Sequence, residues 1–199
     1  MHRRSVLLGA SAFAVASALP AFAANVAEDF VSANVQAGFD ILNDKTLDVA
    51  ARKQRFAAFL LNLTDVKRVA LFLIGKTSAP QADIDAYLAA YQDYILAVYQ
   101  SYFAQYAGQS LKVVSSRARA ADDYIVSTTM TGGGNALPVE FRVRTDGAKP
   151  VLVDLSVMGV WLAENYRNTF ADEIESSSIS ALIEKLASRN KALNKARPS

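Results

Sequence analysis

The sequence has no cysteine, and its single histidine, His2, lies at the extreme N-terminus. Without cysteine the chain has neither a disulfide bond nor a thiolate nucleophile. Without a histidine beyond residue 2 it has no Ser-His-Asp triad and no histidine metal site. Any catalysis would depend on carboxylates, tyrosines, lysines or hydroxyls. We therefore predict no metal. The sequence also marks no cofactor site and no catalytic residue.

An excess of charge of one sign is also missing. The chain has 21 basic and 19 acidic residues, and the two counts become equal when Arg3 and Arg4 are set aside. A protein without net charge has no global field that attracts phosphate backbones, so we expect no nucleic-acid partner. No low-complexity linker divides the chain, and its length suits one domain with its own core.

The N-terminus has the parts of a secretory signal peptide. Paired arginines precede an apolar run over residues 6–19, and Ala-Phe-Ala at 21–23 provides small residues at both positions that a signal peptidase reads. The run is shorter than the roughly 20 apolar residues of a membrane-spanning helix. We predict that residues 1–23 are a cleaved signal peptide and that residues 24–199 form a single domain outside the cytoplasm. The paired arginines fit either general or twin-arginine export.

Helical periodicity dominates the first half of this domain. Apolar residues recur at helical spacing over residues 26–42, and again in two segments that Thr46 and Asp65 can cap. Gly75 has the position of a helix stop. Pro80 is placed at the first position of a longer helix that ends near residue 108.

Tyrosines crowd this longer helix, and two interpretations of them remain open. In the first, the rings lie in the core and the hydroxyl groups at its boundary. In the second, the tyrosines form one wall of a large apolar cavity. The tyrosines are Tyr87, Tyr91, Tyr94, Tyr99, Tyr102 and Tyr106.

Beyond residue 108 the apolar period changes from about 3.6 to 2, which indicates strands. Turn-forming residues separate the runs, so neighbouring strands are expected to pair as an antiparallel meander. Two helices follow, and Ser178 can cap the second. Helices segregated from an antiparallel sheet predict an α+β fold. The predicted strands begin at residues 111 and 124 and cover 137–144 and 151–160, and the helices cover 162–174 and 179–193.

A set of short motifs spaced along the chain gives a further indication. They are Asp65 before Val69–Gly75, Tyr91 to Tyr99, Gly108–Val113, Val153–Val157 with Gly159, and Asn165-Tyr166-Arg167 before Phe170. Their order and spacing over residues 26–186 resemble the MlaC family, the periplasmic phospholipid-binding proteins also called the toluene-tolerance auxiliary family. The chain departs from that pattern at Lys76-Thr77 and Trp161-Leu162, where the family often has Trp-Arg and Ser-Leu.

The resemblance implies a periplasmic carrier and not an enzyme. Proteins of this family carry a glycerophospholipid between an outer-membrane MlaA-like lipoprotein complex and an inner-membrane ABC transporter with MCE-domain subunits, which maintains outer-membrane lipid asymmetry. Their fold is similar to the NTF2-like cone, so the resemblance implies a curved antiparallel sheet of about four strands against helices, with an apolar lipid cavity between them. It also implies a monomer. The lipid-binding residues it suggests are Val69, Phe72, Leu73, Tyr91, Ile95, Val126, Phe141, Val143, Val157, Trp161 and Tyr166.

Asp154 is the residue most easily mistaken for a catalytic group. It lies inside a strand pattern with Arg167 available from the following helix, so we expect a structural ion pair or a hydrogen-bonded carboxylate. Three alternatives stay open: an NTF2-like enzyme acting on a small hydrophobic molecule, a carrier of another apolar lipid, and an adaptor with a filled core. Cations that could lie at a cavity rim are Lys76, Arg117, Arg119, Arg142, Arg144 and Arg167.

Overall fold

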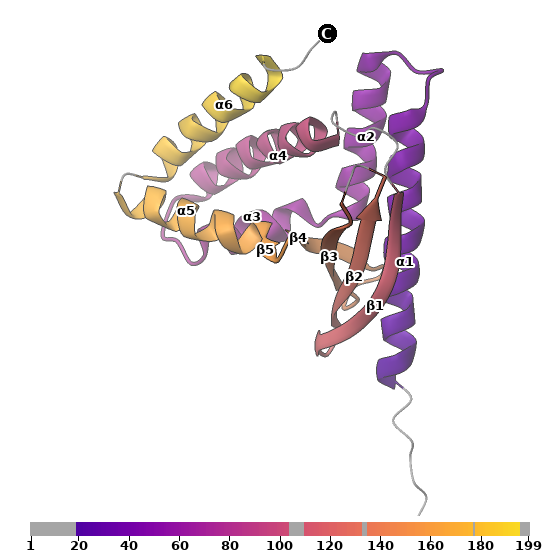
Figure 1. Cartoon of the computed structure of the whole chain (residues 1–199). Coiled ribbons are helices and arrows are strands. Elements are labelled where there is room, and N and C mark those ends of the chain that lie inside the picture. The colour runs from indigo at the N-terminus through magenta and orange to yellow at the C-terminus, as the bar shows by residue number, and fades with distance from the viewer. Residues whose placement is uncertain (1–18, 104–109, 133–134, 177, 196–199) are drawn as a thin grey trace, which may run out of the picture.

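The computed structural model describes residues 19–103, 110–132, 135–176 and 178–195. In these ranges the chain forms six helices and one five-stranded antiparallel sheet, which confirms the α+β prediction (Figure 1). The helices are α1 (Leu19–Asn43), α2 (Val49–Leu63), α3 (Val66–Ile74), α4 (Gln81–Phe103), α5 (Leu162–Ser176) and α6 (Ile179–Lys195). The strands are β1 (Ser110–Ala120), β2 (Asp123–Thr131), β3 (Leu137–Arg144), β4 (Val151–Val157) and β5 (Val160–Trp161).

A side-chain cap sets where α2 begins. Asp48 accepts a hydrogen bond from the backbone N–H of Ala51 at 2.7 Å, which satisfies one of the free donors of the first turn. The prediction that Thr46 caps this helix is wrong. Thr46 instead donates its hydroxyl and its backbone N–H to Asp44, in the turn before the helix.

The two end signals of α3 are confirmed. Asp65 accepts a hydrogen bond from the backbone N–H of Arg68 at 3.0 Å and caps the first turn. Gly75 ends the helix with a φ of 63°, a conformation that glycine adopts without a Cβ clash.

The long helix α4 begins one residue after its predicted start. Pro80 precedes the helix, and its carbonyl oxygen accepts hydrogen bonds from the backbone N–H groups of Asp83 and Ile84. The predicted end of this helix lies outside the described residues. The predicted cap of α6 is confirmed, because the Ser178 hydroxyl accepts from the backbone N–H of Ala181 at 3.2 Å.

Successive strands pair in the order β1-β2-β3-β4-β5, so the sheet is the predicted antiparallel meander. The prediction of one strand over residues 151–160 is wrong, because the chain reverses at Met158 and Gly159. Their φ angles of 53° and 83° are both positive, which is the signature of a two-residue type I′ turn. Val157 and Val160 pair across this turn. Residues 133 and 134, in the predicted turn between β2 and β3, lie outside the described residues.

The helices form two groups on different sides of the sheet (Figure 1). Helix α1 runs along the sheet with α2 beside it, and a small core joins α1 to β2 and β3. Helices α3 to α6 pack together next to β4 around a second core. A parallel bridge from Thr64 to Leu152 ties the junction of α2 and α3 to β4. The small core comprises Ala27, Val31, Tyr124, Val126 and Val143.

Candidate functional site

A cavity of about 510 Å³ is enclosed by α1, α2 and the inner face of the sheet, and Tyr99 and Leu162 complete its wall. Among the described residues that line it, only Asn34 and Tyr99 have polar side chains. Concave sites with walls of this chemistry suit apolar ligands. The other lining residues are Phe30, Val31, Val35, Gly38, Phe39, Phe59, Leu60, Leu63, Leu111, Met130, Leu137, Val139, Phe141, Leu152, Leu155 and Val157.

Asn34 adds little polarity to the cavity wall. Its side-chain amide donates a hydrogen bond to the carbonyl oxygen of Phe30 at 2.7 Å, one turn earlier on the same helix. The donor is therefore satisfied within α1. A ligand in this cavity would be held by burial of apolar surface far more than by hydrogen bonds.

The alternation of β3 and β4 supplies the sheet side of the wall. Phe141 and Leu155 are directly paired, and so are Val139 and Val157, and all four line the cavity. The intervening pair, Glu140 and Ser156, falls on the opposite face because side chains alternate along a strand. A register shift in the β3–β4 ladder next to this region bends the strands.

Gly38 allows α1 and α2 to approach closely at the cavity. A Cβ atom at this position would lie 3.3 Å from the ring of Phe59. Glycine therefore lets the Phe59 ring lie against the backbone of α1, and both residues form part of the cavity wall.

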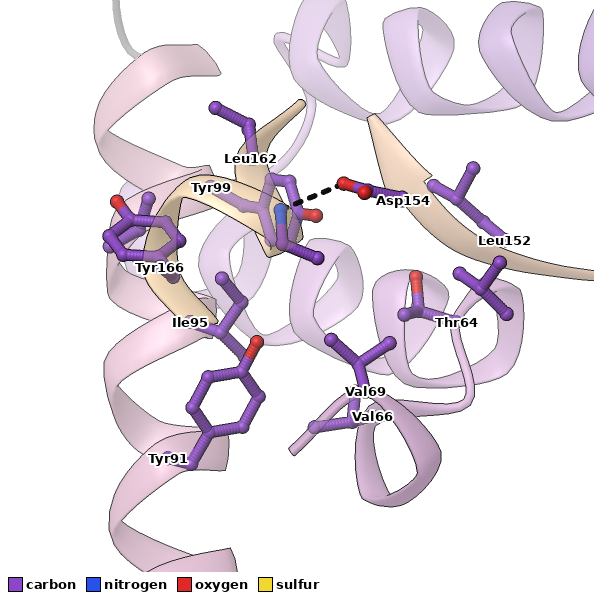
Figure 2. A pocket seen from close by; sticks show the side chains of 13 residues that line it. Thr64, Val66, Val69, Tyr91, Ile95, Tyr99, Leu152, Asp154, Leu162 and Tyr166 are labelled. Atoms are coloured by element: carbon purple, nitrogen blue, oxygen red, sulfur yellow. Dashed lines mark hydrogen bonds between the residues drawn. The ribbon is translucent and has the colours of Figure 1, made fainter. Parts of the chain in front are cut away.

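A second, much smaller void of about 20 Å³ lies between α3, α4, β4 and α5 (Figure 2). It shares Tyr99, Leu152 and Leu162 with the large cavity. Its remaining lining includes polar groups, among them Thr64 and Asp154. A void of this size holds about one water molecule.

Asp154 is a buried, hydrogen-bonded carboxylate. Its Oδ1 accepts from the backbone N–H groups of Leu155 at 2.8 Å and Ala163 at 2.9 Å. The hydrogen bond from Ala163 is the dashed line in Figure 2. Burial raises the pKa of this carboxyl group, and the two backbone hydrogen bonds oppose the shift. The expected ion pair with Arg167 is not formed among the described residues. Instead, the Arg167 guanidinium lies over the ring of Phe72, 4.6 Å from its centroid.

Three tyrosines of α4 fit the interpretation as core residues, and one fits the interpretation as a cavity wall. Tyr87, Tyr91 and Tyr94 are buried in the core of the α3–α6 bundle, where the Tyr87 hydroxyl donates to the carbonyl oxygen of Ala70 at 2.9 Å. Tyr99 lines the cavity. The side chains of residues 102 and 106 lie outside the described part of the chain.

The structure distributes the eleven predicted lipid-binding residues over several environments. Phe141 and Val157 line the large cavity. Trp161 is partly buried in β5 and Phe72 is exposed on α3, and neither lines the cavity or the void. The other seven fall into three sets: Val69, Tyr91, Ile95 and Tyr166 around the void, Val126 and Val143 in the small core under α1, and Leu73 in the bundle core.

The sequence did not reveal the helical side of the cavity. The family resemblance implied that α3 and α4 form this wall, whereas α1 and α2 supply most of it. A signal was present, because Phe30 belongs to the amphipathic pattern of residues 26–42. That pattern shows that one side of α1 is apolar, but it does not show that this side faces an open space.

Four of the six possible rim cations lie on the outer face of the sheet. Arg142 donates three hydrogen bonds of 2.8, 3.0 and 3.3 Å to the buried Asp123, and Arg144 binds Asp146 at 2.6 Å. Since Phe141 and Val143 point inward, their neighbours on β3 point outward. The other two cations of this face, Arg117 and Arg119, form ion pairs with Glu140 and Asp123.

The described part of the chain contains no group of three or more histidine, cysteine, aspartate or glutamate residues arranged to hold a metal ion. In the same ranges, no helix combines the length and the hydrophobicity needed to cross a bilayer.

An open antiparallel sheet and two helices around an apolar cavity form the architecture of a protein with room for an apolar ligand. A family model described as "MlaC protein" matches residues 32–188, so the chain belongs to the MlaC family. The search of curated proteins gave no match.

A solved structure has a similar fold. It is the phospholipid-binding protein from Ralstonia solanacearum in complex with a phospholipid, which is 22% identical to this chain. The alignment covers 84% of this chain and 98% of the other, with a TM-score of 0.74. At this level of identity the likeness establishes a common fold.

Proposed function

We propose that this protein binds a glycerophospholipid with its acyl chains in the cavity of about 510 Å³, and carries it through the periplasm. The observation that carries the proposal is the almost wholly apolar wall of this cavity in a chain of the MlaC family. The phospholipid bound by the similar Ralstonia protein supports the same class of ligand. A carrier of another apolar lipid is the competing proposal.

As partners we propose an MlaA-like lipoprotein complex in the outer membrane and an inner-membrane ABC transporter with MCE-domain subunits. The role of the carrier would be to maintain outer-membrane lipid asymmetry, and it would work as a monomer. Burial of acyl chains is worth about 0.8 kcal/mol per methylene, but a lipid leaving a bilayer gives up the same stabilisation. Exchange through water would expose the chains, so docking to a membrane complex is needed to shield them.

Within this proposal, direct lipid contact falls to the side chains that line the cavity. Phe141 and Val157 are the sequence-predicted residues in this position. Phe30, Val35 and Phe59 face them from α1 and α2. The predicted residues that line only the void, or neither space, would act through the packing of the wall.

The test is native mass spectrometry with lipid extraction on protein purified gently from the periplasm. We expect one diacyl phospholipid for each protein molecule. An isoprenoid or another apolar lipid in its place would favour the competing carrier. Protein that is empty and also takes no lipid from phospholipid vesicles would contradict both.

A second test places a charge in the cavity and uses the same charge at the surface as its matched control. Val157→Lys puts an ammonium group in the apolar wall, where solvation of the charge is poorer than at the surface. Val114→Lys makes the same change on β1 at a side chain that is 64% exposed and lines neither space. We expect the first variant to lose bound phospholipid and the second to retain it, with both folded by circular dichroism.

Among the described residues that line the large cavity there is no carboxylate to serve the enzyme alternative. An acid-base mechanism would need a carboxylate and a tyrosine, and Asp154 and Tyr99 both line the void. At about 20 Å³ this void admits no substrate larger than water. We therefore propose binding and transport without catalysis.

Export requires the leader, and we propose that the mature chain begins at Ala24. Removal of residues 1–23 would shorten α1 by its first five residues, 19–23, and leave its cavity-lining residues in place. The intact mass of protein recovered from the periplasm measures the cleavage site directly. A mass that includes the leader would contradict this proposal.

A further inference from the structure

Three side chains separate the large cavity from the small void. Tyr99, Leu152 and Leu162 line both spaces, and we call them the partition. In Figure 2, Tyr99 and Leu162 lie on one side of the void, away from Val66 and Tyr91. The partition is therefore the end wall of the large cavity in the direction of the α3–α6 bundle.

The spaces on the two sides of the partition differ in chemistry. The cavity side is apolar, whereas the void contains the Asp154 carboxylate and the hydroxyl of Thr64. The Thr64 Oγ1 is buried and has no hydrogen-bond partner in the described part of the chain. A polar void of about 20 Å³ suits a water molecule and disfavours a methyl group.

The partition is held from three elements. Tyr99 continues α4 beyond Tyr94 and Ile95, both of which are buried in the bundle core. Leu162 begins α5, whose first turn is bound to β4 through Asp154. Leu152 is held by its bridge to Thr64. The end wall is therefore tied to α4, α5 and β4.

We propose that Tyr99 is the residue that limits acyl-chain length in this protein. Its ring ends the apolar cavity, so a chain that reaches the ring gains nothing from further methylenes. Tyr99 is then a specificity-determining residue whose aromatic ring, and not its hydroxyl group, sets the limit. This inference rests on the proposed function, because it requires that lipid chains occupy the cavity.

The experiment measures the dissociation constants of a series of lysophosphatidylglycerols whose single chains increase by two methylenes at a time. Each methylene that enters an apolar site strengthens binding about fourfold. For the wild-type protein we expect this gain to stop at a particular chain length, which we call the break. Tyr99→Ala should move that break to chains longer by about two to four methylenes, since more chain is then buried before the fourfold gain stops. Tyr99→Phe keeps the ring and should leave the break unchanged.

Leu162→Ala opens the same partition from α5 and provides a second variant. It should also move the break toward longer chains. If Tyr99→Ala does not unfold cooperatively, Leu162→Ala tests the role of the partition in its place. An unchanged break in a folded Tyr99→Ala or Leu162→Ala variant overturns the role of the partition while leaving the carrier function in place. A break moved equally by Tyr99→Phe assigns the limit to the hydroxyl and overturns the role of the ring. A wild-type protein that binds no member of the series, and that also neither carries phospholipid after purification nor takes it from vesicles, overturns the proposed function together with this inference.

Discussion

The Asp154 carboxylate accepts a hydrogen bond from the backbone N–H of Ala163 at 2.9 Å, which fixes the first turn of α5 to β4. The same oxygen accepts from Leu155 N–H, so one buried side chain serves two backbone donors. The first turn of a helix has free N–H groups and favours negative charge nearby. This contact determines where Leu162, one residue earlier, stands at the end of the cavity.

Asp154→Ala removes the acceptor for two backbone donors. A donor left buried and unpaired costs about 1–3 kcal/mol, so we expect the free energy of unfolding to fall by at least this amount. Asp154→Asn keeps a carbonyl oxygen in place and should cost less. Urea denaturation of the wild type and both variants at neutral pH measures the difference, and equal losses in the two variants would show that the hydrogen bonds are not the cause.

The raised pKa of Asp154 makes its charge increasingly unfavourable for folding as pH rises. Burial raises the folded-state pKa above the ordinary 3.8, so the native state binds the proton more tightly than the unfolded chain does. Stability therefore decreases as pH rises from 3.8 through the folded-state pKa. Asp154→Asn has no proton to lose, and its stability relative to wild type should improve over this window. Urea denaturation at several pH values from 3.5 upward measures the trend, and a constant difference would contradict it.

Asp146 should show the opposite pH dependence. Hydrogen bonds from Arg144 and Arg68 hold the pKa of its carboxyl group well below the ordinary 3.8. A lowered folded-state pKa stabilises the native state above the unfolded value, and this stabilisation is lost as pH falls through the folded value. We expect Asp146→Asn to be less stable than wild type at pH 7, with the difference shrinking at acid pH. Thermal unfolding of both proteins at pH 7 and at acid pH tests this prediction. A stability difference that widens at acid pH would refute the lowered pKa of Asp146.

The buried pair of Asp123 and Arg142 should be costly to break. Asp123 is 3% exposed and also lies within 4 Å of Arg144 and Arg119. Its removal leaves Arg142 and Arg119 without their anion, whereas Arg144 keeps Asp146. Loss of one partner of a buried ion pair costs about 3–5 kcal/mol. Asp123→Ala should lower the free energy of unfolding by about 3 kcal/mol.

An exposed ion pair is the control for this measurement. Arg55 pairs with Asp44 at 3.3 Å, and the Arg55 side chain is 60% exposed. Exposed pairs contribute about 0–1 kcal/mol, so Arg55→Ala should cost less than 1 kcal/mol. Similar losses in the two variants by urea denaturation would mean that burial does not strengthen the Asp123 pair.

A substitution in the turn between β4 and β5 should increase the stability of the protein. Met158 has a φ of 53°, which is strained for a residue with a long side chain, and it is 71% exposed. Asparagine followed by glycine is the preferred sequence of a type I′ turn, so Met158→Asn should stabilise the protein by up to about 1 kcal/mol. Gly159→Ala, at a φ of 83°, should destabilise it by about 1–2 kcal/mol. Thermal unfolding checks both, and changes of the same sign would contradict the turn assignment.

Local signals along the chain predicted much of the fold because each depends on a few neighbouring residues. The caps at Asp65 and Ser178 and the stop at Gly75 are examples. The change of apolar period after residue 108 predicted the strands, and the turn-forming residues between the runs predicted the meander. The positive φ angles at Met158 and Gly159 escaped this reasoning, because an apolar run does not show where the backbone reverses.

The amino-acid sequence by itself determined the order of helices and strands, the exclusion of histidine and thiolate chemistry, and the motifs that resemble the MlaC family. Only the tertiary structure decided that α1 and α2 form the helical wall of the cavity. It also decided that Asp154 binds the start of α5 instead of Arg167. The physical reason is that periodicity records which face of an element is apolar, whereas a cavity and a buried polar contact depend on the distances between packed elements.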